Sequence, residues 1–287
     1  MTTVKQQPCS GITRQSWNAT KGTRKQYVNN GVYYISHLLN ISLTYILIRA
    51  IMNFKDATSA MAFYGVYHRN PYNQLIHFFG VPGIIYSLFV FQCHLPLSIS
   101  SSSPTSQQQR GGTIMIDFVP GIPSHPINYA TVWVVIYILF YLSIDVFGAI
   151  FYAPCLYYMY SSAIQWVLSD QVDSRKRIEN KSKSLPTKTL NWMGSGKPLL
   201  YAGLIHFVSW YIQIKLGHEL IEHAQPAVLQ SIGGAFSAAP LFAFYEFVWL
   251  IGLCKEFQYN VLTQVATYTK ELCTAGTINI QACNVYV

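Results

Sequence analysis

The segment Gln74–Leu95, with the sequence QLIHFFGVPGIIYSLFVFQCHL, contains no Asp, Glu, Lys or Arg. A second segment, from Phe118 to Ser169, contains a single charged residue, Asp145. A helix needs roughly 20 apolar residues to cross the hydrocarbon core of a bilayer, and both segments are at least that long. They predict an all-α fold built from membrane-embedded helices.

The composition of the whole chain agrees with this prediction. Of its 287 residues, 51% are hydrophobic and only 10% are charged, whereas about 25% are charged in an ordinary soluble domain. The same numbers exclude disorder for most of the chain. We therefore expect a polytopic, multi-pass helical bundle with about five to six hydrophobic helices, at residues 33–52, 74–95, 127–145, 147–168, 199–217 and 227–252.

The polar parts of the sequence divide the chain into three regions. Residues 1–32 form a polar, basic N-terminal segment, residues 33–255 form the membrane domain, and residues 256–287 form a C-terminal tail. Two connections interrupt the membrane domain: a low-complexity Ser/Gln-rich loop at 98–112 and a basic loop at 170–197. Their compositions are typical of segments that do not build a core.

The net charge of +8 is compatible with nucleic-acid binding or with a membrane, so the positions of the basic residues decide. Lys and Arg concentrate in the N-terminal segment and in the basic loop at 170–197, and both flank apolar runs. Cytoplasmic loops of membrane proteins carry such an excess of positive charge. The pattern predicts a lipid bilayer as a partner and argues against nucleic acid.

The first group of chemically active residues is YHRNPYNQLIH at 67–77. Asn70 directly precedes a proline, which is typical of a helix N-cap followed by proline at the first helical position. Asn73 and His77 are four residues apart and share a helix face, while His68 lies in the preceding turn. The pattern fits a ligand site, and it also fits a hydrogen-bonded helix start with interfacial histidines.

The second group is GHELIEH at 217–223. His218 and Glu222 are four apart, which on an α-helix suits a metal ligand and the carboxylate that orients it. His223 points to another side of such a helix and is the weaker candidate. The zinc-protease motif is excluded because its histidines are four apart, whereas these are five apart. A polar turn between two membrane helices is the alternative.

Both groups are expected to meet, because four predicted spans separate His77 from His218 and so place them on the same membrane face. Ionisable residues inside or at the ends of apolar helices are functional candidates, and this chain offers two, Asp145 and Glu246. Imidazoles together with a carboxylate suit iron, zinc or copper alike. Apolar surroundings favour iron, because unreactive lipid bonds require redox chemistry.

The combined pattern resembles the DUF962, or Mpo1-like, family of 2-hydroxy fatty acid dioxygenases over about residues 60–255. Three blocks carry the resemblance: His68-x-Asn70-Pro71-x-Asn73-x-x-x-His77, then Gly217-His218-x-x-x-Glu222-x-x-x-Pro226-Ala227, and finally Ala239-Pro240-x-Phe242-x-x-Tyr245-Glu246.

The resemblance implies an Fe(II)-dependent α-oxidation in internal membranes, the endoplasmic reticulum being the expected one. A 2-hydroxy fatty acid and O2 would yield a fatty acid one carbon shorter, within sphingolipid breakdown. It implies that His68, His77 and His218 are iron ligands, with His223 as a weaker one. Asn73, Glu222 and Glu246 would serve catalysis by orienting ligands or completing the shell, and Asn70 and Gln225 would contact substrate, Gln225 standing where the family pattern has arginine.

Three other functions are alternatives to this one. A diiron fatty-acyl hydroxylase or desaturase needs about eight histidines in HxxxH and HxxHH spacings, and this chain lacks those spacings. A different non-haem iron lipid oxidase, or a non-catalytic membrane protein whose polar helix ends only fix topology, stays open on the sequence alone.

Overall fold

The computed structural model describes residues 32, 34–49, 54–95, 97, 115–116, 125–181 and 194–276. The predicted loop at 98–112 and nearly all of the N-terminal segment 1–32 lie outside these residues. The chain divides into two compact units, Met1–Ile41 and Ser42–Val287. Residues 34–49 are helical, and every element described below belongs to the second unit.

Capping residues fix where the first helices begin. Helix α2 spans Ala57–Gly65 and starts with a capping box, in which Asp56 accepts from the Ser59 backbone while Ser59 accepts from the Asp56 backbone. Helix α3 spans Pro71–Cys93, and its N-cap Asn70 accepts a hydrogen bond from Tyr72 N at 2.9 Å. The predicted N-cap and proline start of this helix is therefore present.

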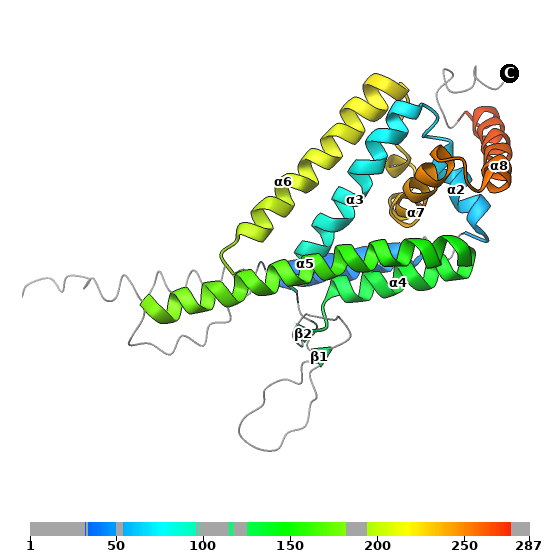
Figure 1. Cartoon of the computed structure of the whole chain (residues 1–287). Coiled ribbons are helices and arrows are strands. Elements are labelled where there is room, and N and C mark those ends of the chain that lie inside the picture. The colour runs from blue at the N-terminus through cyan, green and yellow to red at the C-terminus, as the bar shows by residue number, and fades with distance from the viewer. Residues whose placement is uncertain are drawn as a thin grey trace, which may run out of the picture. The chain divides into compact units, whose positions relative to one another are not determined.

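The middle of the chain forms a helical hairpin. A pair of two-residue strands, β1 (Met115–Ile116) and β2 (His125–Pro126), precedes it. Helix α4 spans Tyr129–Ile144, and helix α5 spans Val146–Lys181. The two helices pack against each other along α4, as Figure 1 shows in green.

The last third of the chain supplies the remaining helices. Helix α6 (Lys197–Tyr211) continues directly into η1, a π-helix over Ile212–Glu222. A short 3-10 turn, η2 (Ala227–Leu229), leads into α7 (Ile232–Leu250), and α8 (Lys255–Thr274) follows. Long π-helical segments are rare and are frequently found at functional sites.

Helix α3 is the central element, because it packs against α6 and η1 and also contacts α4, α5 and α7. Figure 1 shows α3 and α6 side by side. Gly80 permits the close approach of η1, the continuation of α6, since a Cβ at that position would lie 2.6 Å from the Gln213 side chain. Small residues serve the same purpose in membrane helix pairs, where they let two backbones come close.

Helix α7 is tied to its neighbours on both sides. The Tyr137 and Tyr141 hydroxyls of α4 donate to the backbone oxygens of Phe236 and Ser237, each at 2.9 Å. Helix α2 packs between α7 and α8. These contacts hold α2, α3, η1 and α7 around one region, the site described below.

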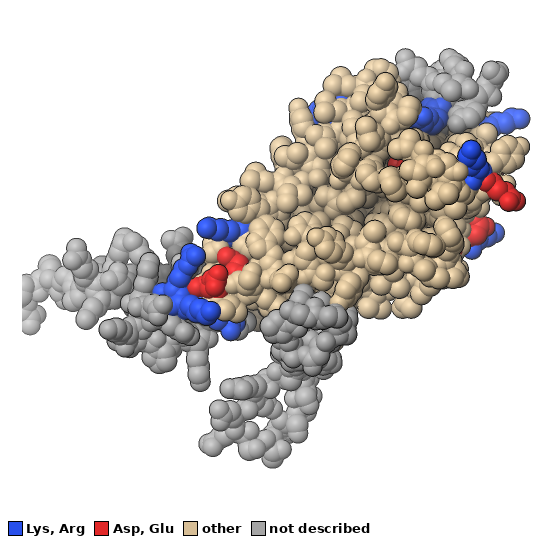
Figure 2. Space-filling model, in the orientation of Figure 1, with Lys and Arg blue, Asp and Glu red and all other residues tan. Residues whose placement is uncertain are grey.

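The all-α class is confirmed, and three described helical segments are long and apolar enough to cross a membrane. They are Pro71–Cys93, Lys197–Glu222 and Ile232–Leu250, while the apolar helix Tyr129–Ile144 is shorter. The sequence predicted about five to six such helices. On the visible face in Figure 2, Lys, Arg, Asp and Glu gather at the far end of α5 and around α8, with a broad uncharged surface between them.

Two segments differ from the sequence expectation. Residues 170–181, expected to begin a basic loop, continue α5 as helix to Lys181. Residues 255–274, in a tail whose pattern predicted no element, form α8. The length of an apolar run indicates which part of a helix lies in the hydrocarbon core of a bilayer. A helix can continue beyond that core, because its backbone hydrogen bonds do not depend on apolar side chains. The end of an apolar run therefore does not mark the end of a helix.

Candidate metal centre and apolar pocket

Three histidines from distant parts of the chain converge near the N-terminal end of α3. His68 precedes α3, His77 lies two turns into it, and His218 lies in η1. One ring nitrogen from each lies within 4.8 Å of the others, and all three residues are buried. Within the described residues, no other group of three His, Cys, Asp or Glu side chains meets this geometry.

Hydrogen bonds fix the orientation of two of these rings. His68 Nδ1 lies 2.9 Å from the Tyr64 carbonyl oxygen, and His77 Nδ1 lies 2.9 Å from that of Asn73. Each Nδ1–H donates to its carbonyl, which leaves the Nε2 lone pair for a ligand. This backbone-anchored arrangement is usual for histidines that bind metals.

The remaining nitrogens show that the group fits a metal ion. His68 Nε2 and His218 Nδ1 are buried and have no hydrogen-bond partner in the described structure. Burial, together with the neighbouring imidazoles of His77 and His218, holds the pKa of His68 well below its usual 6.5, so that its ring is neutral at pH 7. Neutral, converging imidazole nitrogens are a donor set that suits Fe(II), Zn(II) or Cu(II).

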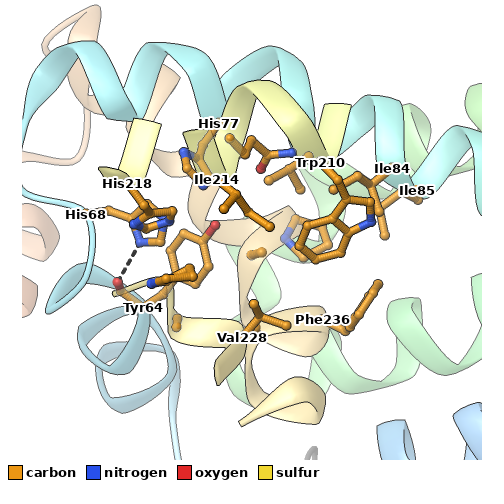
Figure 3. Close-up of a pocket in the computed structure, with 17 residues that line it drawn as sticks. Tyr64, His68, His77, Ile84, Ile85, Trp210, Ile214, His218, Val228 and Phe236 are labelled. Atoms are coloured by element: carbon orange, nitrogen blue, oxygen red, sulfur yellow. Dashed lines mark hydrogen bonds between the residues drawn. The ribbon is translucent and has the colours of Figure 1, made fainter. Parts of the chain in front are cut away.

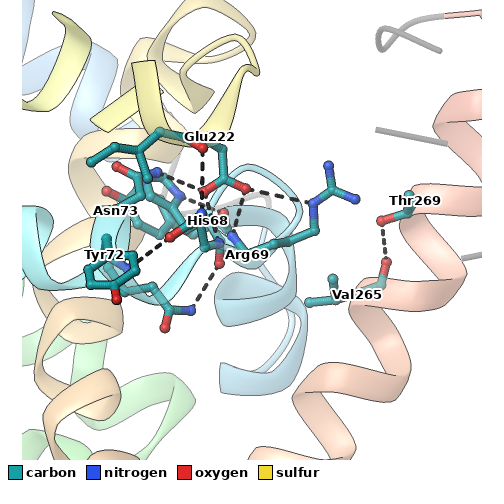
Figure 4. A network of polar contacts seen from close by, with 11 residues as sticks. His68, Arg69, Tyr72, Asn73, Glu222, Val265 and Thr269 are labelled. Carbon is teal, nitrogen blue, oxygen red and sulfur yellow. Dashed lines mark hydrogen bonds and ion pairs between the residues drawn. The ribbon is translucent and has the colours of Figure 1, made fainter. Parts of the chain in front are cut away.

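Glu222 links the two sequence motifs without belonging to the histidine group. Its carboxylate accepts from Arg69 N at 3.0 Å, Asn70 N at 2.9 Å and Asn73 Nδ2 at 3.1 Å (Figure 4). The Arg69 guanidinium adds a longer ion pair at 3.9 Å, and the Glu222 side chain is 3% exposed. Charge-assisted bonds to several N–H donors stabilise a buried carboxylate, so Glu222 fastens η1 to the start of α3.

Asn73 completes this connection. It is fully buried, and its backbone oxygen orients His77 while its side chain donates to Glu222. Gly217 faces it from η1, and a Cβ on Gly217 would overlap the Asn73 side-chain oxygen and lie 3.4 Å from His77 Cε1. The residue before His218 must therefore be glycine for η1 to come this close to α3.

The other predicted site residues lie around this group rather than in it. Asn70 caps α3 and its amide nitrogen donates to Ile221 O at 3.4 Å, so its side chain is used in the fold. His223 ends η1 with a left-handed backbone (φ 53°). His223 and Gln225 line a surface hollow that also includes His218.

Glu246, on α7, is buried, and neither of its carboxylate oxygens has a hydrogen-bond partner in the described structure. It does not line the pocket that contains the histidines. Its charge nevertheless reaches Tyr64, whose pKa is raised well above 10 by burial first and by Glu246 second. The Tyr64 hydroxyl is thus protonated at neutral pH.

An apolar pocket begins at the three histidines (Figure 3). It is a narrow cavity of about 50 Å³ between α2, α3, α6, η1 and α7. No Lys, Arg, Asp or Glu lines it, and apart from the histidines its walls are mostly aliphatic and aromatic: Val81, Ile84, Ile85, Ile214, Val228, Ala235 and Phe236 contribute. The lining is that of a site for an apolar ligand.

Trp210 and Phe236 form the end of the pocket away from the three histidines, and their ring centroids lie 6.1 Å apart (Figure 3). The Trp210 indole N–H donates to His206 Nε2 at 3.0 Å, and His206 Nδ1 lies 2.8 Å from Ser87 Oγ. Both nitrogens of His206 are thus engaged. They hold the indole against the pocket from helices α6 and α3.

Tyr64, which lies in the pocket wall beside the histidines, was not predicted as a site residue. Its ring stacks on that of His68 with centroids 3.8 Å apart and planes 8° from parallel. The available signal was its position four residues before His68. It went unused because α2, at nine residues, is too short to be predicted as a membrane span.

Comparison with known proteins identifies the family. A family model described as "2-hydroxy-palmitic acid dioxygenase Mpo1-like" matches residues 54–251. The chain belongs to the Mpo1-like family. The matched range holds all three histidines, Glu222, Glu246 and the complete pocket lining. Searches among curated proteins and among solved structures found no match.

Proposed function

We propose that this Mpo1-like protein is an Fe(II)-dependent dioxygenase that shortens 2-hydroxy fatty acids by one carbon. The observation that carries the proposal is the pocket itself, in which three converging imidazoles that could hold a metal ion lie at one end of a mostly apolar cavity. Such a cavity fits a molecule with one chelating end and one hydrocarbon end. The family match supports the same reaction class.

The proposed reaction balances with O2 as the sole oxidant. A 2-hydroxy acid RCH(OH)COOH and O2 give RCOOH, CO2 and water, because breaking the C1–C2 bond and oxidising C2 to a carboxyl group removes four electrons. An Fe(II) ion held by His68, His77 and His218 would supply the redox chemistry for this step and a site for the oxygen atoms of the substrate.

The residues of the chain position the reactants. The Tyr64 and Asn73 carbonyls hold two imidazoles in the tautomer that leaves Nε2 available. Glu222 holds the η1 histidine segment against the start of α3. The aliphatic walls bind the alkyl chain and exclude water, which fixes the C1–C2 bond near the metal group.

We also propose that the protein acts in the endoplasmic reticulum membrane during sphingolipid breakdown. Three membrane-competent helices support a membrane location. Exposed apolar residues of α6 support it too, since Leu200, Leu204 and Phe207 are each more than half exposed, and soluble monomers rarely expose a contiguous apolar patch of that kind. Cell fractionation with organelle markers tests the compartment.

The activity is tested with the purified full-length protein in lipid nanodiscs. Aerobic incubation with 2-hydroxypalmitate and Fe(II) is expected to release the C15 acid, and omission of Fe(II) or O2 is expected to abolish it. Palmitate and 3-hydroxypalmitate serve as matched controls and should yield no shortened acid. Absence of C15 acid from the iron-loaded protein would refute the proposed function.

A further inference from the structure

Tyr64 contacts His68 and His77 of the three-histidine group through its ring and its backbone oxygen, and not through its hydroxyl. Its backbone oxygen accepts from His68 Nδ1, and its ring stacks on the His68 imidazole. It also approaches His77 edge-on, with ring centroids 6.3 Å apart. These contacts explain why an aromatic residue occupies this position, but phenylalanine would make all of them.

The hydroxyl of Tyr64 points into the apolar pocket (Figure 3). The residue is 4% exposed, and within the described structure its hydroxyl has no hydrogen-bond partner. Four other buried tyrosines differ in this respect: the hydroxyls of Tyr137, Tyr141, Tyr160 and Tyr245 are hydrogen-bonded to Phe236 O, Ser237 O, Thr131 Oγ1 and Asp145 Oδ2. Tyr67 and Tyr152 are buried without such a bond in the described structure, but neither lines the pocket. The Tyr64 hydroxyl is thus distinguished by facing the cavity, where a ligand can supply the partner that a tyrosine hydroxyl usually has.

The other side chains of the pocket wall indicate which kind of ligand atom would accept this hydrogen bond. Besides the histidines and Tyr64, two side chains in the wall carry N–H donors, Trp210 and Gln213. Trp210 already donates to His206 at 3.0 Å, and Gln213 donates to Ser209 O at 2.9 Å. Gln213 keeps a second amide N–H. With no Lys or Arg in the lining, this N–H and the Tyr64 O–H are the donors that the described wall offers to an anionic head group, and the Tyr64 side chain is the one that stacks on His68.

We propose that the Tyr64 hydroxyl donates a hydrogen bond to the carboxylate of the bound 2-hydroxy acid and so positions its head group beside the three histidines. This inference rests on the proposed function. Tyr64 supplies the recognition that a cation would otherwise give, since Gln225 lies in the adjoining surface hollow and carries no charge.

The test is Tyr64→Phe in the iron-loaded protein, with binding measured by calorimetry in the absence of O2. The substitution keeps the stacked ring and the backbone oxygen, so iron content is expected to equal that of the wild type. Affinity for 2-hydroxypalmitate should fall about tenfold or more, because a hydrogen bond to a charged group is lost. Affinity for its methyl ester, which has no carboxylate, should change less than threefold.

Tyr67→Phe is the matched control, since Tyr67 is a buried neighbour that does not line the pocket, and it should bind both ligands as the wild type does. Equal acid affinity in Tyr64→Phe and wild type would overturn the inference while leaving C15 acid formation, and hence the proposed function, intact. Loss of iron from Tyr64→Phe would also overturn it, by showing that Tyr64 acts on His68. A wild type that neither binds nor shortens the acid would refute the proposed function instead.

Discussion

The two ends of the pocket each rest on a histidine whose ring nitrogens have different partners. At one end, His68 bonds a carbonyl through Nδ1 and keeps a buried Nε2 without a partner in the described structure. At the other end, His206 uses both nitrogens, one with Ser87 and one with Trp210. The first ring is available to a metal, and the second is a structural support for the pocket wall.

A third histidine shows that an available nitrogen alone does not make a metal site. His94 bonds Val90 O through Nδ1 and leaves Nε2 buried without a partner in the described structure, as His68 does. It belongs to no group of converging ligands among the described residues. The group of His68, His77 and His218 therefore differs from His94 in that side chains from separate segments converge there. We call this end of the pocket the metal end.

The largest expected effect comes from removing ligands at the metal end. The double change His68→Ala with His218→Ala should reduce iron content, measured by mass spectrometry of the purified protein, to background. His206→Ala should retain wild-type iron, because its nitrogens face Ser87 and Trp210. Iron retained in the double variant would mean that the metal binds elsewhere.

A smaller loss is expected when the ligands stay but their support is weakened. Glu222→Gln replaces a carboxylate that accepts three N–H bonds with an amide that has one acceptor oxygen. Changes to such supporting groups typically lower metal affinity 10–100-fold, which a competition titration with a chelator measures. Glu219→Gln, at an exposed residue paired with Lys215, should leave the affinity unchanged; an equal loss there would contradict the role given to Glu222.

Close packing at the metal end predicts opposite effects at two glycines. Gly217→Ala should lower stability by about 1–3 kcal/mol, because its Cβ overlaps Asn73 and overpacking carries that cost. Gly203→Ala on α6 meets no atom within 4 Å and should be neutral or stabilising by up to about 1 kcal/mol. Denaturation in detergent measures both, and equal effects would show that η1 and α3 are not in close contact.

At the apolar end the expected effect is on substrate choice. Trp210→Ala removes part of the end wall and should raise the turnover of longer 2-hydroxy acids relative to shorter ones about tenfold. A tenfold change is the lower limit of the discrimination that one methylene group gives in an apolar pocket. Phe207→Ala changes an exposed residue of the same helix and should keep the wild-type ratio. A mixture of chain lengths in one reaction gives the ratio directly, and an unchanged ratio for Trp210→Ala would exclude the wall as a determinant.

The metal end was largely predictable from the sequence, because local rules determine it. Asn70 and the following proline mark the start of α3, and the spacing to Asn73 and His77 follows from helix geometry. The structure brings His77 and His218 together, as predicted, while the four intervening spans on which that prediction relied stay a prediction. The separate role of Glu246 in catalysis stays a prediction.

The remaining features depend on contacts that a linear pattern does not encode. His218 and Glu222 were predicted to lie on an α-helix, whereas η1 is π-helical. The periodicity of apolar residues over so short a stretch does not distinguish an α-helix from a π-helix. The side chain of Asn70 caps α3 and reaches Ile221, and its contact with substrate stays a prediction. Tyr64 and Trp210 belong to the pocket only because α2 and α6 pack where they do.

X-ray absorption at the iron edge, on protein loaded anaerobically with Fe(II), tests the metal centre most directly. The account predicts one iron per chain and the multiple-scattering signature of three coordinated imidazoles, reduced in His77→Ala and unchanged in His206→Ala. An iron spectrum without coordinated imidazole, or one that His77→Ala does not alter, would contradict a centre formed by His68, His77 and His218.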